Sequence, residues 1–169
     1  MPNDRPRSTA AAATDLDGVD LALLRTLDRD GRTTNADLAA AAGVAPSTAL
    51  VRTRALQSRG VIRGVHADLD PAAVGRPLQA LIAVRLHGHT HAHVDAFRTM
   101  APGLPGVIQV FHVAGQDDYL IHVAAADADA LRALILDHVT SHPAVRATQT
   151  QLVFEHLRGN GLLEDRGSP

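Results

Sequence analysis

Cysteine, tryptophan and lysine are absent from this chain, and aromatic residues make up only 2% of it. The lack of cysteine excludes disulfides, thiolate metal sites and a cysteine nucleophile. No apolar run approaches the ~20 residues that a membrane-spanning helix needs. Residues 1–15 contain arginines and alanines without a strongly apolar core, which favours a disordered tail over a signal peptide. We therefore expect a cytoplasmic protein with no membrane partner.

What the chain does contain is a basic segment within a protein of formal net charge −2. From Leu38 to Ala67 there is no acidic residue, while four arginines fall in the same window. Residues 16–76 carry eight arginines against seven acids, whereas residues 77–156 carry four against seven. This asymmetry indicates a module that meets an anion, followed by a module with another role.

The first module, residues 16–64, is expected to hold three short helices. Asp17 and Thr34 each stand as an N-cap with an aspartate three residues later, and Gly31 and Gly43 stand where the first two helices would end. The third helix is expected to begin at a proline and to end before a glycine, with a short β-rich stretch after it. Two helices joined by a tight turn, after a helix that packs on both, form a winged helix-turn-helix.

The third helix carries the arginines. A helical wheel turns Leu50, Thr53 and Leu56 inward, so that Arg52 lies on the opposite stripe and Arg54 lies close enough to the inward direction to pack over the core. Small and hydroxyl side chains with guanidinium groups are typical of a helix that reads double-stranded DNA. The alternative is an ordinary solvated helix face. The residues predicted to contact DNA are Ser47, Thr48, Val51, Arg52, Arg54, Arg59 and Arg63.

The second module, residues 78–157, changes to a periodicity of two. Four strand-like stretches and two amphipathic helices follow in the order βαββαβ, which predicts a ferredoxin-like α+β domain with one sheet face under two helices. Residues 65–77 are expected to be a linker and residues 158–169 a C-terminal tail. The other sheet face also carries apolar side chains, Leu120 or Val110 depending on register, which predicts a homodimer formed sheet to sheet.

The order and spacing of these features resemble the Lrp/AsnC (feast/famine) family of transcription regulators over nearly the whole chain from Leu16 to about Leu157. The residues that carry the resemblance in the first half are Leu16, Asp17, Asp20, Leu23, Leu24, Asp30, Gly31, Arg32, Leu38, Gly43, Arg52, Leu56, Gly60, Val61, Ile62 and Gly64. In the second half they are Val113, Gly115, Asp118, Tyr119, Leu120, Val145, Thr148 and Thr150.

The resemblance implies a transcription regulator, with no enzymatic activity, whose first module binds DNA as a dimer. The second module would associate further, commonly into tetramers or octamers, and sense a small molecule, often an amino acid. The positions that match the family's effector site are Gly115, Gln116, Asp117, Asp118, Tyr119, Thr148 and Thr150. A glycine turn offers backbone N–H groups to a carboxylate, and Asp118 offers an acceptor to an ammonium group. The alternative is that this turn only builds a tight hairpin around a core tyrosine.

Four histidines recur at every second residue from His87 to His93. On a strand they would share one face and suit Zn²⁺ or Ni²⁺, which would make the protein a metal-responsive regulator. Gly88 and a helix beginning near Thr90 break the strand, so we expect a solvated loop, no metal site and no cofactor. A second alternative is an enzyme that resembles the siroheme decarboxylases, which share this architecture. The acid-free arginine segment argues against it.

Overall fold

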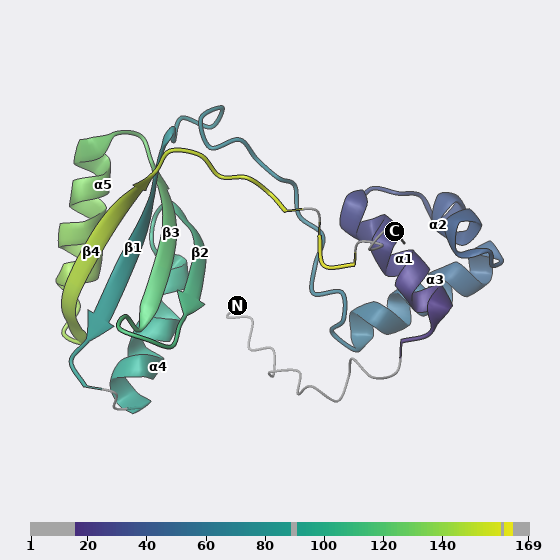
Figure 1. The fold of residues 1–169 in the computed structure, drawn as a ribbon, viewed down its shortest axis with the longest axis horizontal. Coiled ribbons are helices and arrows are strands. Elements are labelled where there is room, and N and C mark those ends of the chain that lie inside the picture. Colours follow the sequence, from purple (N-terminus) through teal and green to yellow (C-terminus); the bar gives the residue numbers. More distant parts are fainter. Residues whose placement is uncertain (1–15, 89–90, 160, 164–169) are drawn as a thin grey trace, which may run out of the picture. The chain divides into compact units, whose positions relative to one another are not determined.

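A computed structural model describes residues 16–88, 91–159 and 161–163 of the chain. They form two compact units, of which one includes residues 16–67 with 158–163 and the other residues 68–157. Figure 1 shows a three-helix unit and a unit with helices and a sheet. No helix among the described residues is long and apolar enough to cross a membrane. The predicted disordered tail, residues 1–15, lies outside the described residues.

The first unit contains α1 (Gly18–Arg29), α2 (Asn35–Ala42) and α3 (Pro46–Ser58). The predicted caps of α1 and α2 are confirmed. The carboxylate of Asp17 accepts a hydrogen bond from the backbone N–H of Asp20 at 2.9 Å, and the hydroxyl of Thr34 accepts one from Asp37 at 3.2 Å. Gly43 ends α2 with φ +66°, a backbone conformation that glycine adopts without strain. These local signals fix where the helices begin and end.

Two expectations for this unit are wrong. Gly31 does not cap α1, because the helix ends at Arg29 with an extended Asp30. Gly31 instead lies so close to the side chain of Val65 that a Cβ at this position would collide with it. The β-rich stretch expected after α3 does not form, since no strand lies between α3 and Leu78 in this part of the described chain. No neighbouring strand is present to exchange backbone hydrogen bonds with this segment, so it does not form a β-strand.

The core of the first unit is small. Leu23 of α1 and Leu38 of α2 pack with Ala39 and Ala49, and Leu56 of α3 is also buried, so two of its five buried apolar residues are alanines. Alanine at both facing positions lets α2 and α3 approach closely. Residues 158–163 also belong to this unit: Arg25 donates to the carbonyl of Leu163 at 3.1 Å.

The second unit confirms the order βαββαβ. Its elements are β1 (Leu78–Leu86), α4 (His91–Met100), a 3₁₀ turn η2 (Ala101–Gly103), β2 (Val107–His112), β3 (Tyr119–Ala125), α5 (Ala128–Leu134), a π-helical turn η3 (Ile135–Thr140) and β4 (Val145–Val153). The strands are all antiparallel and lie in the order β2-β3-β1-β4. This is the ferredoxin-like arrangement that the sequence predicts.

Alternation along β1 places one face of the sheet in the core, as predicted. Ile82 and Val84 are fully buried and pack with Phe97 of α4 and Leu134 of α5. The register settles the open face: Leu120 pairs with Phe111 on it, whereas Val110 pairs with Ile121 and faces the core. Leu120, and not Val110, is therefore the apolar side chain that the helices leave uncovered.

Candidate DNA-binding surface and ligand turn

The buried side of α3 is rotated by about 50° around the helix axis from the predicted one. This rotation changes which arginine faces outward. Ala49 and Leu56 are the buried residues of the helix, and Leu50 is 40% exposed. Steps of 100° per residue from this buried side bring Ser47, Val51 and Arg54 to the opposite side, and all three are exposed. The inward orientation predicted for Leu50 is wrong, because alanine at position 49 fills the space against α2.

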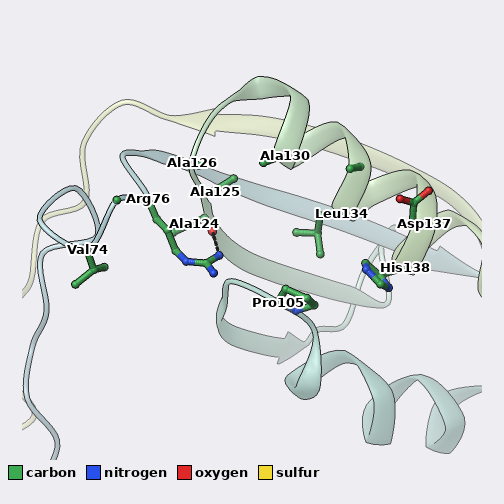
Figure 2. A pocket seen from close by; sticks show the side chains of 12 residues that line it. Val74, Arg76, Pro105, Ala124, Ala125, Ala126, Ala130, Leu134, Asp137 and His138 are labelled. Atoms are coloured by element: carbon green, nitrogen blue, oxygen red, sulfur yellow. Dashed lines mark hydrogen bonds between the residues drawn. The ribbon is translucent and has the colours of Figure 1, made fainter.

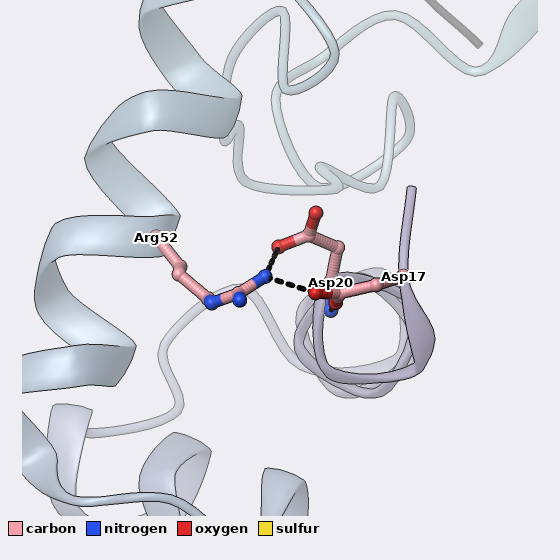
Figure 3. Close-up of polar contacts among 3 residues, drawn as sticks. All are labelled: Asp17, Asp20 and Arg52. Atoms are coloured by element: carbon pink, nitrogen blue, oxygen red, sulfur yellow. Dashed lines mark hydrogen bonds and ion pairs between the residues drawn. The ribbon is translucent and has the colours of Figure 1, made fainter. Parts of the chain in front are cut away.

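Arg52 lies on the inner flank of α3 and is held within the protein. Its Nη1 donates to Asp17 Oδ2 at 2.6 Å and to Asp20 Oδ1 at 3.0 Å (Figure 3). Asp20 is buried, and its carboxylate is one of the two buried polar side chains in the described chain. The prediction that Arg52 belongs to the outward stripe is therefore wrong; it joins α3 to the N-terminus of α1.

The protonation of this cluster follows from its hydrogen bonds. The N–H of Asp20 and then the Arg52 guanidinium lower the pKa of Asp17 below its ordinary value. Hydrogen bonds to Asp20 and then Asp17 raise the pKa of Arg52. Asp17 and Arg52 are thus charged at neutral pH. The Arg52 guanidinium thus balances part of the charge of Asp17 and Asp20.

Arg54 is the arginine that the outer side presents. The sequence predicts Arg54 as a DNA contact that lies near enough to the inward direction to pack over the core. Its side chain is exposed, with no hydrogen bond or ion pair to any described residue, so it does not pack over the core. Thr48 is also exposed, as are Arg59 at the C-cap of α3 and Arg63 beyond it. Most of the predicted contact residues therefore lie exposed at the surface. Arg52 is the exception, because its guanidinium is bonded to Asp17 and Asp20.

Two further residues share this outer side but were not predicted. Leu50 is 40% exposed, and Ser58 is exposed in the last turn of α3. The sequence assigned Leu50 to the core because leucine is usually buried.

The start of α3 is fixed from outside the helix: Asn35 donates to the carbonyl of Pro46 at 2.8 Å, while Ala45 supplies no side-chain cap, as the sequence indicates.

The predicted ligand turn, residues 113–118, is a tight connection between β2 and β3. Gly115 has φ +137°, which requires glycine, and it is exposed together with Gln116. The backbone N–H of Val113 donates to the carbonyl of Asp118 at 2.9 Å. Gly115, which has no side chain, therefore presents its backbone to the outside.

Both aspartates of the turn contact β1. Asp117 Oδ1 accepts from Arg85 Nε at 2.8 Å, and Asp118 Oδ2 accepts from the backbone N–H of Leu86 at 2.8 Å. Asp118 also donates its own N–H to the carbonyl of Val84 at 2.9 Å. These bonds tie the turn to the end of β1, where the register shifts between Arg85 and Leu86. The carboxylates are positioned by the fold itself.

Tyr119 is a core residue. Its side chain is 1% exposed, and its hydroxyl donates to the carbonyl of Val94 at 3.1 Å. Its ring lies 4.9 Å from that of Phe97 and is stacked on His112 at 4.7 Å. Within one chain, the side chain of Tyr119 is therefore too deeply buried to contact a ligand.

Thr148 and Thr150 lie on β4, on the far side of β1 from the turn. Thr148 pairs with Val84, which in turn pairs with Tyr119. Two strand spacings of about 4.8 Å each therefore separate Thr148 from Tyr119. Thr150 lies two residues further along and is exposed. A single chain does not bring these threonines and the glycine turn together.

The histidine run does not form a metal site in the part that the structure describes. β1 ends at Leu86, Gly88 has φ +69°, and α4 begins at His91, so the strand ends as predicted. The ring of His93 hydrogen-bonds the carbonyl of His87 at 2.7 Å. No group of three potential ligands meets among the described residues, and His89 lies outside them.

The chain matches two family models, one in each half of the sequence. Residues 16–63 match the winged helix-turn-helix DNA-binding model, and residues 79–162 match the Lrp/AsnC ligand binding domain. The HTH-type transcriptional regulator AldR of Mycolicibacterium smegmatis is 44% identical over 147 residues, which cover 87% of this chain and 86% of that protein.

Solved structures agree with these matches. The crystal structure of MtbAldR is 39% identical, with a TM-score of 0.77, and the match covers 87% of this chain and 97% of that one. A transcriptional regulator from Neisseria meningitidis in complex with L-Met is 30% identical, also with a TM-score of 0.77, over 85% of this chain and 93% of that one. None of these relatives is named as an enzyme, so the decarboxylase alternative has no support. The chain belongs to the Lrp/AsnC family and is a transcriptional regulator, with a winged helix-turn-helix DNA-binding domain followed by a ligand-binding domain.

Proposed function

We propose that this regulator binds double-stranded operator DNA in the cytoplasm through the outer side of α3, with Ser47, Val51 and Arg54 toward the major groove. The observation that carries the proposal is the exposed, acid-free outer side of α3, which presents Arg54 to the outside. Arginine hydrogen-bonds guanine or phosphate, serine serves either, and an exposed valine suits a thymine methyl group. Thr48, Arg59 and Arg63 extend the surface toward the phosphate backbone.

We also propose that an amino acid or a related metabolite modulates this binding at the glycine turn. The exposed backbone of Gly115 and Gln116 offers N–H donors to a carboxylate, and Asp117 and Asp118 are held beside it by β1. The L-Met complex of the Neisseria relative supports an amino-acid effector. Because Thr148 and Thr150 lie across β1, a second copy of the chain has to complete the site if these threonines contribute.

The test is fluorescence anisotropy of the full-length protein on DNA from upstream of its own gene, across a salt series, with and without each amino acid. We expect tight binding that weakens steeply with salt, because arginines that neutralise phosphates release counterions. A shift of the binding curve with one amino acid would identify the effector. Equal affinity for all DNA sequences at every salt concentration would contradict the proposal of a specific operator.

We further propose that a sheet-to-sheet homodimer covers the open face of the second unit. Phe111 is 45% exposed and pairs with Leu120 on that face. His122 lies on the same face, and burial followed by the neighbouring His156 lowers its pKa, so its ring is neutral at neutral pH. It hydrogen-bonds Gln79 at 3.0 Å. Exposed apolar side chains such as Phe111 normally pack against a partner.

Replacing Phe111 with arginine is therefore expected to convert the dimer to monomers, since a charge buried in the interface loses its water without a counterion. Light scattering coupled to gel filtration would measure the mass. Leu136→Arg is the matched control, because Leu136 is 51% exposed but lies on η3, against the opposite face. A Phe111→Arg protein with the mass of the wild type would exclude this face as the interface.

A further inference from the structure

The second unit has a cavity that none of the proposals above uses. Its volume is about 490 Å³, within the range of small-molecule sites. It is lined by the segment before β1, the end of β3, and the helical turns of α5 and η3. β3 begins beside the glycine turn at Tyr119 and ends beside the cavity at Ala125, so about 20 Å of strand separates the two places. The cavity is distinct from the ligand turn.

One wall of this cavity carries a single guanidinium group, that of Arg76 (Figure 2). Its Nη1 donates to the carbonyl of Ala124 at 3.3 Å, which is its one side-chain hydrogen bond to any described residue. A guanidinium has five N–H donors, so most of them remain available to a ligand. The fork of two parallel donors matches a carboxylate.

Gly106 makes the space in which this guanidinium lies. A Cβ at this position would come within 2.7 Å of Nη1 of Arg76 and would also collide with the carbonyl of Ala124. The backbone there has φ +75°, which again favours glycine. The carbonyl of Gly106 accepts from the N–H of Ala124 at 2.8 Å, so the strand end and the glycine are fixed together. The absence of a side chain at Gly106 and the bond to Ala124 place the guanidinium at the wall of the cavity.

The other walls define the body of the ligand. Ala125, Ala133 and Leu134 are small or apolar, and Asp137 and His138 stand across the cavity from Arg76 (Figure 2). The π-helical turn η3 brings this about: it spaces the buried Leu134 and Val139 five residues apart and leaves His138 exposed at the cavity. A compact apolar chain fits between the guanidinium and these polar groups.

We propose that this cavity is a second ligand site, which binds a small carboxylate with a short, branched apolar chain. The carboxylate pairs with Arg76, and the chain packs on the alanines and Leu134. The site is independent of the glycine turn proposed for the effector.

Isothermal titration calorimetry of the full-length protein tests this with L-valine, 3-methyl-2-oxobutanoate and L-valinamide. We expect both carboxylates to bind and valinamide, which lacks the carboxylate, to bind at least tenfold more weakly. Arg76→Gln and the cavity-filling Ala133→Leu should each weaken the carboxylates at least tenfold. Both positions are exposed, so the fold tolerates the changes. Arg146→Gln, an exposed arginine on β4, is the matched control and should bind as the wild type does.

Three results would overturn the second site. The first is no saturable binding of either carboxylate up to about 10 mM, beyond which an affinity is too weak for a specific site. The second is valinamide binding as tightly as valine. The third is binding that survives Arg76→Gln and Ala133→Leu but is lost in Gln116→Ala, which would place the ligand at the glycine turn and leave only the effector proposal standing. Binding lost in the first two variants and kept in the third would establish the cavity.

Discussion

Replacing Arg52 with alanine is expected to lower the melting temperature of the first unit by roughly 5–10 °C. The change removes the one nitrogen that bonds both Asp17 and Asp20. Asp20 is 6% exposed, so its carboxylate would be left without its cation in a place that water scarcely reaches. Circular dichroism at 222 nm during heating would measure the transition. DNA binding would also fall, but as a consequence of lost folding.

A double-mutant cycle separates this role from DNA contact. Asp20→Ala combined with Arg52→Ala should recover part of the lost stability, because the carboxylate left without a partner is then gone as well. Arg52→Lys should lie between the wild type and alanine, since a single ammonium can take the place of the single Nη1. An Arg52→Ala protein that melts like the wild type and has lost DNA binding would return Arg52 to the DNA surface.

The same cluster predicts how stability depends on pH. The pKa of Asp17 is lowered in the folded protein from its ordinary 3.8, so the unfolded chain binds more protons than the folded one near that pH. The contribution is therefore complete above about pH 4 and is lost as the pH falls through the lower, folded pKa. The raised pKa of Arg52 acts only at strongly alkaline pH. The wild type should thus lose stability more steeply below pH 4 than the Asp17→Asn variant.

The starts of the three helices of the first unit and the end of α2 were predictable because their signals are local. Asp17, Thr34, Gly43 and Pro46 each act within a few residues of their own position, through a cap, a left-handed turn or a fixed φ. The alternation along β1 was equally local, and it placed Ile82 in the core. These patterns were sufficient for the order of elements and for the family resemblance.

The orientation of α3 was not predictable in the same way. Ala49 and Leu50 are adjacent and both apolar, and only the neighbouring Ala39 of α2 makes the smaller residue the buried one. The partners of Arg52 lie 32 and 35 residues away in the chain, so no spacing within the helix reveals them. An arginine on an arginine-rich helix is therefore predicted to be a surface residue. Only the fold shows that Arg52 contacts the start of α1.

The same limit applies to the ligand turn and to the cavity. The pattern Gly-x-x-Asp predicted a turn, and the turn is there, but the groups that hold its aspartates come from β1, 32 residues earlier. The cavity gathers Arg76, Gly106 and His138 from three separate parts of the chain. Sites built from long-range neighbours require the fold before their members can be named.

Replacing Arg54 with alanine is expected to weaken operator binding by roughly tenfold to a hundredfold, the effect of losing one arginine contact to a base or a phosphate. The melting temperature should not change, because Arg54 is exposed and makes no contact that the fold depends on. Fluorescence anisotropy across a salt series measures the affinity. Arg29→Ala is the matched control, since Arg29 is an exposed arginine at the end of α1 and lies outside α3.

The salt series also identifies what Arg54 contacts. If Arg54 binds a phosphate, its loss weakens binding to every sequence alike and lowers the slope of log affinity against log salt by about one for each arginine removed. If it binds a base, operator affinity falls while affinity for unrelated DNA stays closer to that of the wild type. An Arg54→Ala protein with unchanged affinity at every salt concentration would exclude the outer side of α3 as the reading surface. Arg52→Ala and Arg54→Ala remove the same charge two residues apart. If only Arg52→Ala lowers the melting temperature, while Arg54→Ala loses affinity at an unchanged melting temperature, the difference follows from the orientation of the helix.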